Sequence, residues 1–234
     1  MEIRGYLQTS LNEWPGKISA VVWVAGCNFR CPYCQNKDLV LNPEKLPKIP
    51  AEEIFEDLKK RKNWLDAACL TGGEPTLQKD LSRFLSRCQQ MGLLTMVETN
   101  GTRSEVLREL LEKKLLDLIS LDIKGSFDRY PQITQVQVQA SLVKESLRLI
   151  IASGIDFELR TTVVPTLHTK ETLVRLAKNL KELSPKAAWY LQQFVPQNCL
   201  DPSFEKIEPF GREKMEEILA AVKKYVPRAS LRGV

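Results

Sequence analysis

Short apolar segments that alternate with amphipathic segments constrain the fold of this chain more than any other feature of its sequence. The apolar segments are rich in valine, isoleucine and leucine, which is typical of strands buried in a parallel sheet. Strands that are each followed by a helix build right-handed βα units. Six such units are too few for the usual eight-fold barrel, so we predict an α/β fold, a partial (β/α)6 TIM-like barrel with mostly parallel strands. The predicted strands are residues 20–25, 67–70, 93–97, 118–122, 157–164 and 188–194.

The segments between the predicted strands carry apolar residues at the i, i+3, i+4, i+7 spacing of an amphipathic helix. In residues 80–91, for example, Leu81, Leu85 and Cys88 share one face. The predicted helices are residues 51–63, 80–91, 104–114, 140–152, 169–183 and 212–225. The chain has no internal repeat, low-complexity tract or break in composition, so we expect residues 1–234 to form a single domain.

Composition and charge exclude several classes of protein. The longest apolar run, residues 18–27, is about half of the ~20 residues that a membrane-spanning helix needs. Glu2 and Arg4 open the chain without an apolar segment behind them, so we expect no secretory signal and a cytoplasmic protein. The net charge of +5 is mild for 234 residues and does not call for nucleic acid as a partner.

Three of the six cysteines, Cys27, Cys31 and Cys34, lie within eight residues of one another. Without a secretory signal, such a cluster indicates a metal or redox site rather than disulfides. Three thiolates leave one iron of a four-iron cluster open to a small molecule. A structural zinc site would need a fourth ligand, for which Cys199 is the only plausible candidate, and this alternative stays open together with inert thiols.

Polar residues gather at the carboxyl ends of the predicted strands. In a barrel of this type the carboxyl ends of the strands meet on one face, where active sites lie. Simpler interpretations are that Glu98 and Asp122 cap the following helices and that the glycine pair is only a turn. The residues predicted at this rim, besides the cysteine loop, are Gly72, Gly73, Glu74, Glu98, Thr99, Asp122, Lys124, Arg160 and Gln193.

Residues 27–34 read Cys-Asn-Phe-Arg-Cys-Pro-Tyr-Cys and resemble the cluster loop of the radical S-adenosylmethionine (SAM) enzymes. The resemblance extends over almost the whole chain, and residues 72–74 resemble the family's Gly-Gly-Glu motif. Residues 9–17 look like the start of activating enzymes for glycyl-radical proteins. Within these, the chain is most similar to the activating protein of anaerobic ribonucleoside-triphosphate reductase, in the branch close to pyruvate formate-lyase activating enzyme.

The resemblance implies a cofactor set and a reaction. Cys27, Cys31 and Cys34 would hold a [4Fe–4S] cluster whose open iron binds SAM. Reductive cleavage of SAM would give a 5′-deoxyadenosyl radical that removes hydrogen from a glycine of a partner glycyl-radical enzyme. The electron would come from a low-potential donor such as flavodoxin or ferredoxin. We expect no nucleic acid and no membrane as partners.

The resemblance also assigns roles to single residues. Tyr33 would lie beside the adenine, although it could equally be a loop-packing aromatic. Glu74 would accept from the amino group of SAM, and Lys124 would contact SAM or the incoming peptide. Arg160 would face SAM, unless it forms a salt bridge with Glu158 or Asp122, and Gln193 would also face the cofactor. Glu98, Thr99 and Asp122 would hold a monovalent cation, with Glu98 standing where the family often has aspartate.

Val195 bears on the identity of the client. Pyruvate formate-lyase activators carry a histidine where this chain has Val195, which favours the ribonucleotide-reductase branch or another client.

Two alternatives come from other classes of protein. A small-molecule radical SAM enzyme resembling 7-carboxy-7-deazaguanine synthase would share the cysteine loop and the run Thr-Gly-Gly-Glu-Pro of residues 71–75. A non-enzymatic iron–sulfur or zinc binding module would differ from both enzymes in its metal and sulfide content.

Overall fold

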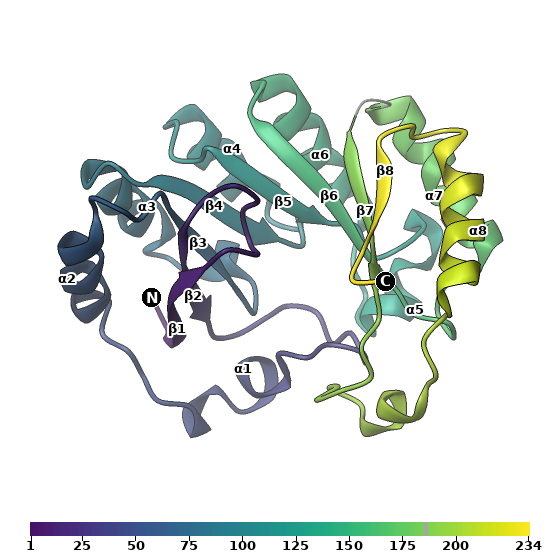
Figure 1. Ribbon diagram of the computed structural model, residues 1–234, viewed down its shortest axis with the longest axis horizontal. Helices are drawn as coiled ribbons and strands as arrows, with labels where there is room; N and C mark the ends of the chain where they lie inside the picture. Colours follow the sequence, from purple (N-terminus) through teal and green to yellow (C-terminus); the bar gives the residue numbers. More distant parts are fainter. Residues whose placement is uncertain (185–186) are drawn as a thin grey trace.

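A computed structural model describes residues 1–184 and 187–234 of the protein. Within these residues, eight strands form one curved sheet in which the strand order follows the chain from β1 to β8 (Figure 1). Strands β2 to β8 run parallel, and β1 pairs antiparallel with β2. The predicted α/β partial barrel with mostly parallel strands is therefore confirmed. The strands are β1 Ile3–Ser10, β2 Ser19–Val24, β3 Ala67–Gly72, β4 Leu94–Thr99, β5 Leu118–Asp122, β6 Asp156–Val163, β7 Ala188–Gln193 and β8 Ala229–Arg232.

The six predicted strands correspond to β2–β7, and the two strands that the sequence did not predict are the edges of the sheet. Strand β1 carries Arg4, Gly5 and Gln8, and most of its residues are partly or fully exposed. Strand β8 has only four residues. Edge strands lack a neighbour on one side and need no continuous apolar run, so neither one shows the signature of a buried parallel strand.

Helices cover the outer face of the sheet (Figure 1). The predicted helices are confirmed to within three residues at each end. Helices α1 and α5 were not predicted, because five residues are too few to show a helical period. The helices are α1 Lys37–Leu41, α2 Ala51–Arg61, α3 Leu81–Gln90, α4 Ser104–Glu112, α5 Tyr130–Thr134, α6 Ala140–Ser153, α7 Lys170–Leu183 and α8 Arg212–Lys223.

Alternate side chains of the strands enter two different environments. In β2, Ala20, Val22 and Val24 belong to the main core between the sheet and the helices. Val21 points to the other face and packs with Cys69 and Met96. On β2, β3 and β4 the inner face of the sheet is thus apolar towards the amino ends of the strands, while polar residues follow nearer their carboxyl ends. This arrangement leaves the rim free to carry the site.

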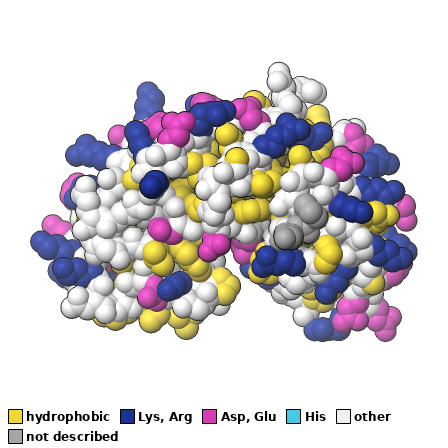
Figure 2. Space-filling view, turned by 90° about the horizontal axis from the view of Figure 1, so that it is seen from above, with side chains coloured by type: hydrophobic (Ala, Val, Ile, Leu, Met, Phe, Trp, Pro, Cys, Tyr) yellow, Lys and Arg dark blue, Asp and Glu magenta, His cyan; other side chains and the backbone are white. Residues whose placement is uncertain are grey.

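The sheet stays open on one side. Strands β1 and β8 are its two edges, and no pairing between them occurs among the described residues. The space-filling view shows a hollow on this side of the molecule, with hydrophobic and acidic side chains at its inner end (Figure 2).

In the part of the chain that the structure describes, no helix is both long and apolar enough to cross a membrane. The single domain over residues 1–234 stays a prediction.

Candidate active site

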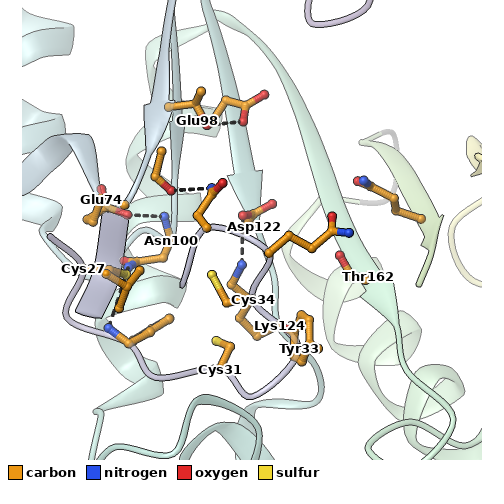
Figure 3. Close-up of a pocket in the computed structure, with 18 of the residues that line it drawn as sticks. Cys27, Cys31, Tyr33, Cys34, Glu74, Glu98, Asn100, Asp122, Lys124 and Thr162 are labelled. Carbon is orange, nitrogen blue, oxygen red and sulfur yellow. Dashed lines mark hydrogen bonds and ion pairs between the residues drawn. The ribbon is translucent and has the colours of Figure 1, made fainter. Parts of the chain in front are cut away.

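A cavity of about 240 Å³ lies at the carboxyl ends of the strands. Figure 3 shows that its side chains come from the cysteine loop after β2 and from the ends of β3 to β7. Of the predicted site residues, only Arg160 does not line this cavity. Those that do are Cys27, Cys31, Tyr33, Cys34, Gly72, Gly73, Glu74, Glu98, Thr99, Asp122, Lys124 and Gln193.

The cysteine loop brings three buried or half-buried thiols to one wall of the cavity (Figure 3). Burial raises the pKa of Cys27 to about 11 and that of Cys31 to about 12, and it also raises the pKa of Cys34. The thiols are therefore protonated at neutral pH in the metal-free protein. Iron binding would replace these protons, as metals do when they bind thiolates.

Gly73 and Gly72 let the end of β3 pack directly on the cysteine loop. A Cβ on Gly73 would lie 1.9 Å from the carbonyl oxygen of Gly26, and one on Gly72 would lie 2.7 Å from backbone atoms of Val24. Gly72 also has a φ of +109°, a region that other residues rarely adopt. The two glycines thus allow two backbone segments to approach each other closely.

Glu74 joins the ends of β3 and β4 from a buried position, with 1% of its surface exposed. Oε1 accepts hydrogen bonds from the backbone N–H of Thr76 and from the hydroxyls of Thr76 and Thr99. Oε2 accepts from the backbone N–H of Asn100 at 2.7 Å. Burial raises the pKa of Glu74, and these hydrogen bonds oppose the rise. The carboxylate that the resemblance assigned to the amino group of SAM is thus already bonded within the protein.

Asp122 and Lys124 form an ion pair in the cavity, with 2.9 Å between Oδ2 and Nζ (Figure 3). Burial is the largest single effect and disfavours the ammonium, but Asp122, Tyr33 and Cys31 together outweigh it and hold the pKa of Lys124 well above its usual range. Burial likewise raises the pKa of Asp122, and the charges of Lys124 and Arg160 more than compensate, so that its pKa is lowered. Both groups are therefore charged at neutral pH.

Arg160 lies in a neighbouring cavity of about 310 Å³ inside the barrel. Its Nη1 is 2.7 Å from Oε1 of Glu98, and its Nε is 3.5 Å from Asp122 and 3.7 Å from Glu158. The structure thus shows the salt-bridge interpretation of Arg160, with Glu98 as a further partner that the sequence did not suggest. The other oxygen of Glu98 accepts from the hydroxyl of Thr71 at 2.7 Å.

Sequence reasoning missed two asparagines of this site. Asn100 donates to Asn28 at 2.8 Å, and its side-chain nitrogen lies 4.0 Å from the sulfur of Cys27. Asn36 donates to the carbonyl of Gly72 at 2.8 Å. The signal for Asn100 is its place directly after Thr99, at the carboxyl end of β4.

Residues 195–201, after β7, close over the cysteine loop. The backbone N–H of Asp201 donates to the carbonyl of Pro32, and the side chain of Asn198 donates to the carbonyl of Gln35, both at 2.9 Å. Cys199, the candidate fourth zinc ligand, is fully buried in this segment. Over residues 1–184 and 187–234, no group of three or more histidine, cysteine, aspartate or glutamate side chains is arranged to hold a single metal ion.

The family model of the radical SAM superfamily matches residues 21–183 of the chain. That match covers more than half of the 234 residues. The chain belongs to the radical SAM superfamily. The resemblance that the cysteine loop indicated is thereby confirmed.

Curated relatives of this radical SAM protein cover most of its length. A Methanocaldococcus jannaschii protein named as a glycyl-radical enzyme activating enzyme is 32% identical over 99% of this chain and 96% of its own. The pyruvate formate-lyase-activating enzyme of Streptococcus mutans is 31% identical over 73% of this chain and 68% of its own. Both names agree with the branch that the sequence indicated.

Solved structures agree with the fold of this radical SAM protein. A domain of pyruvate-formate lyase-activating enzyme from Bacteroides vulgatus has a TM-score of 0.59 at 18% identity and covers 72% of this chain and 99% of its own. Streptococcus suis SuiB bound to its precursor peptide SuiA has a TM-score of 0.69 at 16% identity and covers 91% of this chain. This chain spans 48% of SuiB.

The cavity fits the [4Fe–4S] cluster and SAM that the radical SAM family implies. Its three thiols come from one loop and are the ligand type that iron–sulfur clusters require. Two polar atoms of the lining, the hydroxyl of Tyr33 and Oε1 of Gln193, are buried without a hydrogen-bond partner among the described residues. Because buried polar atoms are normally bonded, these two indicate the place of a polar ligand.

Proposed function

We propose that this radical SAM protein is an activating enzyme that generates the radical of a partner glycyl-radical enzyme, and that residues 1–234 form a single radical SAM domain. The observation that carries the proposal is the set of three buried or half-buried thiols that share one cavity with the unpartnered hydroxyl of Tyr33 and the unpartnered Oε1 of Gln193. The name of the relative that aligns with 99% of the chain supports it.

The chain's own residues bind and enclose the cofactors in this proposal. Cys27, Cys31 and Cys34 hold the cluster, while Tyr33 and Gln193 offer hydrogen bonds to SAM. Lys124 attracts the carboxylate of SAM, because its ammonium faces the same cavity. A bound [4Fe–4S] cluster would pass an electron from the external donor to SAM, and the 5′-deoxyadenosyl radical released by this cleavage would remove a hydrogen atom from the client's glycine.

Anaerobic ribonucleotide reductase is the client that we propose, with flavodoxin or ferredoxin as the low-potential electron donor. Val195, which stands where pyruvate formate-lyase activators carry a histidine, lines the cavity with 42% of its surface exposed. An apolar group at this exposed position would contact the client rather than exchange a proton with it. The sheet is open between its edges β1 and β8, and this opening would give a protein segment access to the site.

Two measurements on one preparation test this function. The protein is reconstituted anaerobically, reduced and supplied with SAM, and 5′-deoxyadenosine is quantified. The purified reductase is then added, and its glycyl radical is detected by electron paramagnetic resonance. We expect both products. Zinc without sulfide in the native protein would contradict every radical SAM interpretation, and 5′-deoxyadenosine without a glycyl radical would contradict the client.

We further propose that Arg160 replaces the monovalent cation that the resemblance placed beside Glu98, Thr99 and Asp122. Its guanidinium already neutralises Glu98 and Asp122. The hydroxyl of Thr99 donates to Glu74 rather than pointing at a free site. The rate of SAM cleavage should therefore be the same in sodium, potassium and tetramethylammonium chloride at equal ionic strength. Saturable activation by potassium or sodium alone would show that a cation binds here after all.

A further inference from the structure

We infer that His168 and Tyr130 are positioning residues of the active site, which hold Lys124 at the cavity wall by binding the two polar groups of its backbone. The inference rests on the proposed function, because it takes Lys124 to contact SAM. Neither residue belongs to the cavity lining. Each acts on the site through the backbone segment that follows β5.

His168 lies outside the cavity lining and binds the backbone carbonyl of Lys124. This histidine, the only one in the sequence, has 1% of its surface exposed. Its Nδ1 accepts from the backbone N–H of Val164 at 3.0 Å, so the ring proton resides on Nε2. Nε2 lies 2.8 Å from the carbonyl oxygen of Lys124 and donates to it. Burial lowers the pKa of His168 to about 4, which keeps this neutral tautomer at physiological pH.

Tyr130 binds the other polar group of the same backbone unit. Its hydroxyl accepts from the N–H of Lys124 at 3.1 Å. Its ring meets Phe29 of the cysteine loop edge-on, with 6.5 Å between ring centroids. One residue on α5 thus contacts both the loop that carries the thiols and the segment that carries Lys124.

Helix α5 also holds the cysteine loop by its backbone, since Arg30 donates to the carbonyl of Thr134 at 2.9 Å. The backbone that follows Lys124 is closely packed and cannot shift freely. A Cβ on Gly125 would lie 2.4 Å from Ile133 of α5 and 3.2 Å from Nε2 of His168. Helix α5 and His168 therefore form a bracket that sets the position of Lys124 relative to the thiols.

The placement of Lys124 matters because its side chain has little freedom of its own. Nζ is bound to Asp122, and 19% of the side chain is exposed. A shift of the Lys124 backbone would carry the ammonium and its ion pair away from Tyr33 and Cys31, with which it shares the cavity wall. We therefore expect the bracket to govern the affinity for SAM.

Two substitutions of His168 separate positioning from general stability. In His168→Gln, the amide nitrogen takes the place of Nε2 and can still donate to Lys124. In His168→Asn, the shorter side chain can still accept from Val164 but cannot reach Lys124. Both variants remove the imidazole from the core and should lower the melting temperature by similar amounts. Tyr130→Phe keeps the ring and removes only the acceptor of the Lys124 N–H.

SAM affinity is measured by equilibrium dialysis against the reconstituted, oxidised protein, in which no electron is present to cleave SAM. We expect His168→Asn and Tyr130→Phe to raise the Kd about tenfold, the loss of roughly one good hydrogen bond, and His168→Gln to stay within about threefold of the wild type. In a Lys124→Met background, His168→Asn should add no further loss, because its effect passes through Lys124.

Equal losses in His168→Gln and His168→Asn, or additive losses with Lys124→Met, would overturn the inference. The failure of the proposed function looks different. A wild-type protein that binds SAM but makes neither 5′-deoxyadenosine nor a glycyl radical would contradict that function, while the order of the Kd values would still decide the role of His168. A wild-type protein that binds no SAM would overturn both.

Discussion

Replacing Cys31 with alanine is expected to abolish the iron–sulfur cluster and the cleavage of SAM. Cys31 has 6% of its surface exposed and lies between the other two thiols of the loop. Loss of a residue that only supports a metal ligand costs about 10- to 100-fold in affinity or activity, so loss of a ligand should cost more than about 100-fold. Iron and sulfide content, the absorbance of the reconstituted protein and the yield of 5′-deoxyadenosine measure the effect.

Cys199→Ser is the matched control for this prediction. Cys199 is another buried cysteine, and it lies in the segment that closes over the cysteine loop. In a [4Fe–4S] enzyme the three loop thiols suffice, so Cys199→Ser should keep four irons and nearly the wild-type yield of 5′-deoxyadenosine. In a zinc site built on four ligands, Cys199→Ser would lose the metal as Cys31→Ala does. That result, or an intact cluster in Cys31→Ala, would refute the assignment.

The second large effect is expected for Gly73→Ala, which adds one methyl group where two backbones meet. The new Cβ would lie 1.9 Å from the carbonyl oxygen of Gly26, and no side-chain rotation can relieve a clash with backbone. The cysteine loop must move away from β3, which breaks the hydrogen bonds from Gly73 to Val24 and from Glu74 to Gly26. We expect the free energy of unfolding to fall by about 3 kcal/mol, at the upper end of overpacking effects, and cluster loading to fail.

Gly211→Ala makes the same chemical change at a site with room for it. No heavy atom lies within 4 Å of the position that a Cβ would take at Gly211, which precedes α8. The loss of a glycine at a helix start costs about 1 kcal/mol or less. Urea unfolding and iron content distinguish the two variants. A Gly73→Ala protein as stable and as iron-rich as Gly211→Ala would show that the cysteine loop is not held by this backbone contact.

The sequence predicts the buried strands of this fold well, because each one packs apolar side chains into the core between the sheet and the helices. Strands β1 and β8 escape prediction for the opposite reason: they are edges, and their pairing partners rather than their side chains make them strands. Helices α1 and α5 are short segments whose shape depends on the loops around them.

For the site, the sequence predicts where the residues lie but not which groups they bind. The rule that strand ends carry the site brings Glu74, Glu98 and Lys124 to one rim, and the structure places them there. Which groups they bind depends on contacts far apart in the chain, such as that between Glu98 and Arg160, 62 residues away, and these have no local signal. The contact between His168 and the backbone of Lys124, 44 residues away, likewise has no local signal.

The contact between residues 195–201 and the cysteine loop has a consequence for the order of events during synthesis. Pro32 and Gln35 leave the ribosome early, but their partners Asp201 and Asn198 lie more than 160 residues later. The nascent chain therefore exposes three thiols long before the parts that enclose them exist. The enclosed form of the cysteine loop can therefore exist only after residues 195–201 have been translated, so the loop takes its final surroundings late in synthesis.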